Sequence, residues 1–329
     1  MTPTPPLASL RGACKSYGAV LALGDVDLAL HAGEVLALLG VNGAGKSTAI
    51  GLLLGTVRAD AGHVELLGQP PQVLAARRGA GVMLQTAAVP DTLRVGEALD
   101  LTRSYYADPL PTAECVQLAG LEGLLRRPYG MLSGGQQRRV QFALAVCGRP
   151  RVLFLDEPST GLDVGARERL WQAIRALVAD GCAVLLTTHY LEEAEALADR
   201  VVVLHEGRVA AAGRIGDICA RIVQRRIQCT TTLAADAVRG WPGVRSVEPA
   251  RNGLSVVADD GERVVRRLLA EDPALGDLEV CRAGLAEVFV ALTADGGLDG
   301  GGGAVAAPAA FGAGPATASR GAPRVGEAA

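Results

Sequence analysis

The stretch Gly40-Val41-Asn42-Gly43-Ala44-Gly45-Lys46-Ser47 decides the fold of this 329-residue chain. It fits the pattern GxxxxGK[ST], and it lies between an apolar run at residues 35–39 and a helical pattern at residues 48–57. The glycines let successive backbone N–H groups turn inward around an anion, and the start of the following helix adds its positive dipole end. Lys46 can then reach the outer phosphates of a nucleotide, and Ser47 can offer its hydroxyl to Mg²⁺. The sequence therefore predicts a phosphate-binding loop between a strand and a helix.

Two adjacent carboxylates, Asp156 and Glu157, follow an apolar run at residues 152–155. Ligands sit at the carboxyl ends of strands in open α/β sheets, so both side chains are expected near the phosphate loop. We expect Asp156 to hold Mg²⁺ and Glu157 to polarise the water that attacks the terminal phosphate. The alternative is a solvated acidic loop after a buried strand, and the neighbouring phosphate loop makes this alternative weaker.

A second glycine-rich turn, Leu132-Ser133-Gly134-Gly135-Gln136, precedes a helical stretch at residues 136–147. By itself the turn is only a flexible connection. At the start of a helix, however, its hydroxyl and N–H groups form a second cradle for an anion. Two cradles in one chain imply either two ligands or two chains that close over one ligand.

Taken together, these motifs resemble those of the ATP-binding subunits of ABC transporters, over about residues 7–215. All of them occur in the order typical of that family. They are the Walker A loop at 40–48, the Q-loop glutamine Gln85, the signature at 132–136, the Walker B acids Asp156 and Glu157, the D-loop at 159–163 and the switch histidine His189. Val41 departs from the pattern because relatives usually carry proline there. Its side chain is not needed for phosphate contact, so we expect only a less rigid loop.

The resemblance implies ATP and Mg²⁺ as ligands and a head-to-tail dimer with composite sites. Ser133 and Gly135 of one chain would touch the γ-phosphate that Lys46 of the other chain holds. His189 would steady the γ-phosphate, while Gln85 would contact Mg²⁺ and the attacking water. The resemblance implies that Ser47, Gln85 and Asp156 bind the metal ion and that Glu157, His189 and Gln85 act in catalysis. The implied nucleotide-binding residues are Tyr17, Gly40, Asn42, Gly43, Ala44, Gly45, Lys46, Ser47, Thr48, Ser133, Gly134, Gly135, Gln136 and Asp163.

Ordinary roles remain open for four of these residues when each is taken alone. Tyr17 stands 29 residues before Lys46, where the family places an aromatic ring on the adenine, and a core tyrosine is the weaker alternative. The resemblance implies that Asp163 bridges the two sites, whereas in isolation it is a loop carboxylate. In the same way Gln85 could be a polar residue at a strand end and His189 a strand-terminal cap.

The fold class expected from the pattern is α/β, with a P-loop ATPase domain at residues 1–222. Apolar runs at 35–39, 152–155, 183–187 and 201–204 are too continuous for half-exposed strands, so helices should cover both faces of a mainly parallel sheet. Runs at 26–30 and 63–67 alternate more and are flanked by glycine, which favours an antiparallel side sheet. A helical subdomain is expected at about residues 86–148.

The sequence pattern of the C-terminal third differs from that of the ATPase domain. Residues 223–294 predict a small accessory α+β domain with short strands and two helices. The last helix is marked by Leu285, Val288, Phe289 and Leu292 at i, i+3, i+4 and i+7. Residues 295–329 are dominated by Gly, Ala and Pro, so we expect them to be disordered, because such a segment buries too little surface to offset its ordering entropy.

Composition narrows the function further. The formal net charge of −3 gives no basic field for nucleic acid. No apolar run approaches the roughly 20 residues of a membrane helix, and no secretory signal is visible, so a cytosolic location is expected. The seven cysteines are scattered without a CxxC pair, which argues against zinc or a disulfide framework.

Several details resemble one subgroup, the ATPases of drug-resistance and ABC-2 type exporters. They lie at residues 84–85, 91–95, 188–195 and 285–289. The resemblance implies an ATP-hydrolysing homodimer at the cytoplasmic face of the membrane. It would power efflux of a drug-like or other substrate through a separately encoded integral membrane permease of the ABC-2 type.

Two other classes share the motifs. A soluble ABC ATPase of DNA repair or translation usually carries tandem cassettes or long coiled-coil inserts, and this sequence predicts neither. A regulatory ATP-binding module without turnover would not need Glu157 and His189, both of which are present.

Overall fold

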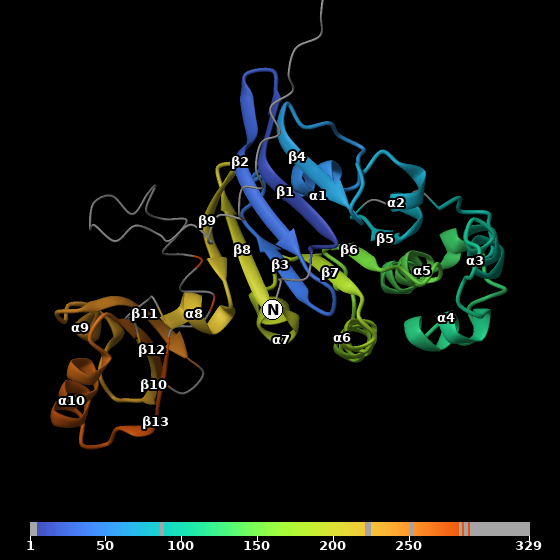
Figure 1. The fold of residues 1–329 in the computed structure, drawn as a ribbon. Helices are drawn as coiled ribbons and strands as arrows, with labels where there is room; N and C mark the ends of the chain where they lie inside the picture. Colours follow the sequence, from blue (N-terminus) through green and yellow to red (C-terminus); the bar gives the residue numbers. More distant parts are fainter. Residues whose placement is uncertain are drawn as a thin grey trace, which may run out of the picture.

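The computed structural model describes residues 5–85, 89–220, 225–250 and 253–282, together with Leu285 and Phe289. Within these ranges the chain forms a central sheet of six strands, a side sheet of three and a C-terminal sheet of four (Figure 1). The expectations for Val288, Leu292 and the tail at 295–329 concern residues outside the described ranges. No helix in the described part of the chain combines the length and the apolar character needed to cross a bilayer.

The central sheet brings five strand ends to one edge. Its order is β5-β6-β7-β3-β8-β9, and every neighbouring pair is parallel except β8 and β9. The strands are β3 (Val35–Leu39), β5 (Ala80–Met83), β6 (Val152–Asp156), β7 (Ala183–Thr187), β8 (Arg200–His205) and β9 (Arg208–Gly213). The loops that follow β3, β5, β6 and β7 carry the expected site residues, and the parallel pairing therefore gathers them.

Both faces of this sheet are covered. One face shares an apolar core with α1 (Lys46–Leu53) and the side sheet. The other face packs against α5 (Gly134–Val146), α6 (Val164–Ala179), α7 (Leu191–Leu197) and α8 (Ile215–Ala220). Strands buried on both sides explain the continuous apolar runs in the sequence.

The side sheet is antiparallel, in the order β2-β1-β4. Its strands are β1 (Ala8–Tyr17), β2 (Val20–Leu30) and β4 (Ala61–Leu66). The runs expected at 26–30 and 63–67 fall almost wholly within β2 and β4. The sequence did not reveal β1, because Arg11, Lys15 and Ser16 interrupt its apolar pattern and its pairing with β2 shifts register.

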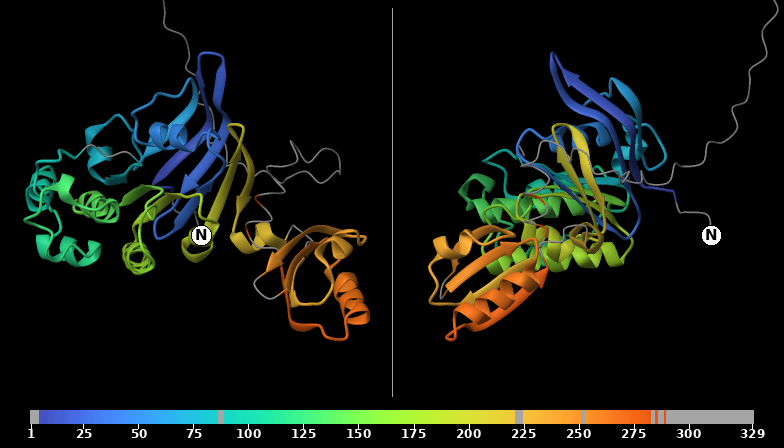
Figure 2. Two further views of the ribbon diagram at one scale, coloured as in Figure 1. Left: turned by 180° about the vertical axis from the view of Figure 1, so that it is seen from behind. Right: turned by 90° about the vertical axis from the view of Figure 1, so that its left-hand side faces the viewer.

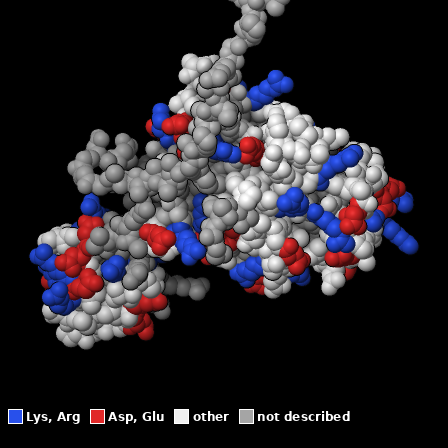
Figure 3. All heavy atoms as spheres, viewed as in Figure 1, with Lys and Arg blue, Asp and Glu red and all other residues white. Residues whose placement is uncertain are grey.

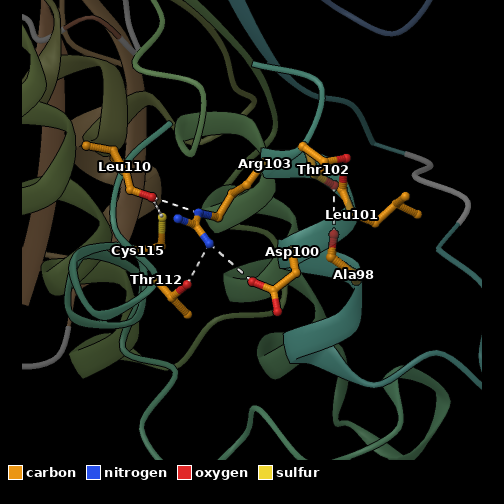
Figure 4. Close-up of polar contacts among 9 residues, drawn as sticks. Ala98, Asp100, Leu101, Thr102, Arg103, Leu110, Thr112 and Cys115 are labelled. Carbon is orange, nitrogen blue, oxygen red and sulfur yellow. Dashed lines mark hydrogen bonds and ion pairs between the residues drawn. The ribbon is translucent and has the colours of Figure 1, made fainter. Parts of the chain in front are cut away.

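A group of helices lies at one side of the central sheet, beyond β5 (Figure 1). It contains α2 (Leu74–Arg78), α3 (Val95–Arg103), α4 (Thr112–Ala119), the 3₁₀ turn η1 (Tyr129–Met131) and α5. Arg103, the last residue of α3, joins α3 to the start of α4 (Figure 4). Its Nε donates to the carbonyl of Leu110 at 2.8 Å, and one terminal nitrogen donates to the hydroxyl of Thr112 at 2.8 Å and to Asp100 at 3.2 Å. One guanidinium thus fixes the loop between two helices.

The C-terminal unit has the element order β-α-β-β-α-β (Figure 2). Its elements are β10 (Arg225–Thr230), α9 (Ala235–Arg239), β11 (Val244–Ala250), β12 (Gly253–Ala258), α10 (Gly261–Glu271) and β13 (Gly276–Arg282). The antiparallel sheet has the order β11-β12-β10-β13, which with this element order is the ferredoxin-like arrangement. Its own apolar core, including Ile227, Trp241 and Leu268, lies between the sheet and the two helices.

Candidate nucleotide site

The phosphate loop turns from the end of β3 into α1. Gly43 and Gly45 have φ values of +86° and +105°, which side-chain-bearing residues rarely adopt. A Cβ at Gly45 would lie 2.5 Å from the carbonyl oxygen of Ala22, and one at Gly40 would lie 2.6 Å from that of Leu204. Helix α1 begins at Lys46, two residues earlier than the pattern suggested, so its first N–H groups point at the space inside the loop.

Lys46 is bonded to the backbone of its own loop. Its Nζ donates to the carbonyl oxygens of Gly40 at 2.6 Å and Val41 at 3.2 Å. Burial lowers the pKa of Lys46, and the negative charges of Glu157 and Asp156 work in the opposite direction. The ammonium group is therefore a desolvated cation, which favours a bound anion.

The two acids leave β6 in different directions. Asp156 is 9% exposed, and one of its oxygens accepts a hydrogen bond from the hydroxyl of Thr187 on β7. Glu157 has a φ of +50°, and its N–H still donates to the carbonyl of Thr187 at 2.9 Å. The backbone turns at this point, and the two carboxylates have different partners although they are adjacent in sequence.

Glu157 lies between the two polar side chains expected to act with it. Gln85, which follows β5, donates from Nε2 to Glu157 Oε2 at 3.3 Å. His189, which follows β7, places Nδ1 3.1 Å from Glu157 Oε1. Three strand-end loops therefore meet at one carboxylate.

These side chains line an open pocket of about 560 Å³. Tyr17, Val20 and Leu21 form its apolar end, which suits a nucleotide base, and the phosphate loop with the acids forms its polar end. The full lining is Tyr17, Val20, Leu21, Ala22, Asn42, Gly43, Gly45, Lys46, Ser47, Thr48, Gln85, Asp156, Glu157 and His189. Of the loop residues expected to bind the nucleotide, Gly40 and Ala44 do not line the pocket: Gly40 packs against the backbone of Leu204, and Ala44 is buried.

The signature residues do not line this pocket. Ser133 is the N-cap of α5: its hydroxyl accepts from the N–H of Gln136 at 3.3 Å, and the Gln136 side chain accepts from the Ser133 N–H at 3.1 Å. Gly134 and Gly135 form the first turn of the same helix. Asp163 is likewise the N-cap of α6 and accepts from the N–H of Ala166 at 2.8 Å. Within one chain the second cradle is thus preformed and separate.

Four pocket or support residues were missed by the sequence reasoning. Val20, Leu21 and Ala22 begin β2. The exposure of Val20 and Leu21 beside Tyr17 follows from the hairpin at Gly18, and the local pattern does not locate this hairpin relative to the phosphate loop. Thr187 ends the predicted strand at 183–187, and a polar residue at such a strand end was an available signal.

Comparison with known proteins identifies the family. The ABC transporter family profile matches residues 23–160. The Nod factor export ATP-binding protein I of Rhizobium johnstonii is 39% identical over 218 residues, which are 64% of this chain and 70% of that protein. The doxorubicin resistance ATP-binding protein of Mycobacterium tuberculosis is 34% identical over 87% of this chain and 93% of its own length. The daunorubicin resistance ATP-binding protein of Streptomyces coeruleorubidus is 36% identical over 86% and 95%.

Solved structures agree with the fold. The ATP-binding subunit of an ABC transporter superposes with a TM-score of 0.61 and 31% identity, covering 65% of this chain and 92% of that one. A dimeric ATP-binding cassette in a post-hydrolysis state with ADP and phosphate gives a TM-score of 0.59 at 25% identity, over 63% and 98%. The predicted α/β fold class, with its parallel core and side sheet, is confirmed. The chain belongs to the ABC transporter family and is one of its ATP-hydrolysing subunits.

Proposed function

We propose that this ATPase is the motor of an exporter whose membrane-spanning permease is a separate polypeptide of the ABC-2 type. The observation that carries the proposal is the extent of similarity to drug-resistance subunits. It covers 86–87% of the chain at 34–36% identity and so includes much of the C-terminal unit as well as the nucleotide site. We place the protein at the cytoplasmic face of the membrane, with a drug-like or other substrate handled by the permease.

The site residues fit the roles expected of them. Ser47, Gln85 and Asp156 supply hydroxyl, amide and carboxylate oxygens in one pocket, which are the donors that Mg²⁺ prefers. When bound, Mg²⁺ would offset the charge of the phosphates. Lys46 would exchange its bonds to the loop carbonyls for bonds to phosphate oxygens.

Hydrolysis is assigned to the group around Glu157. Glu157 would orient the attacking water and accept its proton. His189, which lies beside Glu157, would hold the terminal phosphate. Gln85 would report the state of this group to the permease, since it joins Glu157 to the end of β5. Tyr17 would stack on the adenine from the apolar end of the pocket.

The second cradle is proposed to complete the site of a partner chain. Ser133, Gly134, Gly135 and Gln136 would approach the γ-phosphate held by the partner, and Asp163 would lie at the junction of the two sites. Two identical chains satisfy this arrangement because each carries both cradles. In this scheme residues 1–222 form the ATPase domain with a helical subdomain at about 86–148, and residues 223–294 form the accessory domain.

Recovery of the permease tests the proposal. The tagged protein is crosslinked in its native cells, purified from solubilised membranes and analysed by mass spectrometry. We expect a polytopic membrane protein to copurify, and Leu84→Asp beside Gln85 to abolish its recovery. The matched control is Leu269→Asp, because Leu269 is also an exposed leucine but lies on α10, away from Gln85 in the sequence. Recovery of only ribosomal or DNA-associated proteins from the soluble fraction would overturn the transport assignment and favour the DNA-repair or translation class.

A further inference from the structure

The helix that follows His189 is short and weakly capped. Helix α7 spans seven residues, Leu191–Leu197, and its N-cap Tyr190 makes no side-chain cap bond. So short a helix is marginal on its own, because nucleation is unfavourable and few internal hydrogen bonds follow. The position of α7, and of the switch histidine two residues before it, is therefore set by what packs against it.

Two carboxylates of α7 anchor it to other parts of the molecule. Glu193 is buried and accepts from the indole N–H of Trp171 on α6 at 3.2 Å. Glu195 accepts from the backbone N–H of Leu285 at 2.8 Å, across 90 residues of sequence. The second contact joins α7 to Leu285, which follows β13 in the chain.

Leu285 is inserted where α7 meets the central sheet. Its side chain is fully buried and lies in one apolar cluster with Ala194 of α7, Ala37 of β3 and Ile218 of α8. The cluster also contains Leu39, the residue just before the phosphate loop. Leu285 therefore packs in the same apolar cluster as α7 and β3, the strand that leads into the phosphate loop.

We infer that Glu195 and Leu285 are positioning residues that couple the C-terminal unit to His189. They hold α7 so that His189 Nδ1 stays 3.1 Å from Glu157, and a shift of the C-terminal segment moves the histidine through α7. The inference rests on the role proposed for His189 in hydrolysis. It assigns the accessory unit a part in setting the rate of ATP turnover.

Variants of the full-length chain distinguish loss of the contact between Glu195 and Leu285 from general destabilisation of the fold. Glu195→Ala removes the acceptor for the Leu285 N–H, whereas Glu195→Gln keeps a carbonyl oxygen that can accept it. Glu192→Ala is the matched control, because Glu192 is an acid on the same helix and is exposed, as Glu195 is. We expect Glu195→Ala to lower kcat roughly 10-fold with KM for ATP unchanged, since misplacing a catalytic group costs turnover rather than binding. Glu195→Gln and Glu192→Ala should turn over at nearly the normal rate, and Leu285→Ala should reproduce the loss.

Tryptophan fluorescence gives a readout that does not depend on hydrolysis. The chain has two tryptophans, so Trp241→Phe leaves Trp171 as the only one, and its N–H bonds to α7. We expect Glu195→Ala in that background to shift the emission of Trp171 and Glu192→Ala to leave it unchanged.

Normal kcat and unchanged Trp171 emission in both Glu195→Ala and Leu285→Ala would overturn the inference. His189→Ala keeps this failure distinct from failure of the proposed chemistry. If His189→Ala hydrolyses ATP at the normal rate, the role of His189 is wrong. If it is inactive while the Glu195 and Leu285 variants are normal, only the coupling is wrong.

Discussion

Lys46 is the residue that we propose contributes most to ATP binding. It is one of two lysines in the chain, and burial among apolar and backbone groups lowers its pKa. A phosphate that replaces its carbonyl partners gains a charge-assisted hydrogen bond in a partly desolvated site.

Lys46→Ala is therefore expected to weaken ATP binding by roughly 10- to 100-fold, which corresponds to about 1.5–3 kcal/mol for a hydrogen bond to a charged group. Calorimetric titration with ATP measures the change. Arg58→Ala is the control, because Arg58 is an exposed cation outside the pocket. Equal affinity in Lys46→Ala and Arg58→Ala would contradict the assignment.

Asp272 is a second residue with a defined electrostatic role, in the C-terminal unit. The hydroxyl of Thr231 and the N–H groups of Thr232 and Ala274 donate to its carboxylate and hold its pKa below the usual 3.8. The folded state thus favours the ionised form, so the stabilisation is complete above pH 3.8 and is lost as the pH falls through the lower, folded-state pKa.

Urea unfolding of the full chain, followed by Trp241 emission in a Trp171→Phe background, tests this account. We expect Asp272→Asn to be less stable at neutral pH and to lose stability less steeply below pH 3.8. Asp236→Asn changes an exposed acid of the same unit and should alter stability little. An acid dependence in Asp272→Asn as steep as in the parent would show that the loop does not depend on this carboxylate.

At the scale of elements, α5 combines a structural cap with a proposed binding role. Ser133→Ala removes the cap and should cost about 1 kcal/mol of unfolding free energy. Ser133→Asp keeps a good cap but adds a negative charge. We expect Ser133→Asp to unfold like the parent in urea yet to fail in ATP-driven dimerisation, because its carboxylate would face the phosphate of the partner. Dimerisation of Ser133→Asp at the parent's ATP concentration would exclude Ser133 from the composite site.

The connection between α3 and α4 depends on Arg103. Arg103→Met keeps the aliphatic stem but removes the donors to Leu110, Thr112 and Asp100 (Figure 4). We expect a loss of about 1–3 kcal/mol in unfolding free energy, measured in urea. Arg126→Met changes an exposed arginine of the same helical region and should be nearly neutral. Equal stability of the two variants would show that Arg103 contributes nothing to the connection.

The local sequence pattern predicted those elements that are determined by their own residues. The strand before the phosphate loop and the acid-bearing strand both follow from short motifs with a physical reason. The cap at Ser133 was not predicted, because the pattern placed the start of the helix at residue 136 and the structure places it at Gly134. Strand β1 and the contact of Leu285 with α7 could not be predicted in the same way. Polar interruptions hide β1, and the Leu285 contact joins residues 90 positions apart.

At the scale of the whole molecule, charged side chains of both signs share the surface that Figure 3 shows. In Figure 3 acidic and basic side chains are interspersed over both the ATPase part and the C-terminal unit. A mixed surface of this kind, with a net charge of −3, suits protein partners better than a polyanion. The second cradle does not line the chain's own pocket, and we propose that it meets another ATPase chain.

The most direct measurement is light scattering of Glu157→Gln with and without ATP, combined with phosphate release. The substitution keeps the size of the side chain and removes the carboxylate that we propose orients the water. The account predicts hydrolysis at least 100-fold slower than in the parent, within the range for loss of a general base, together with a stable dimer that forms only with ATP. Hydrolysis at the parental rate, or a chain that stays monomeric at saturating ATP, would contradict it.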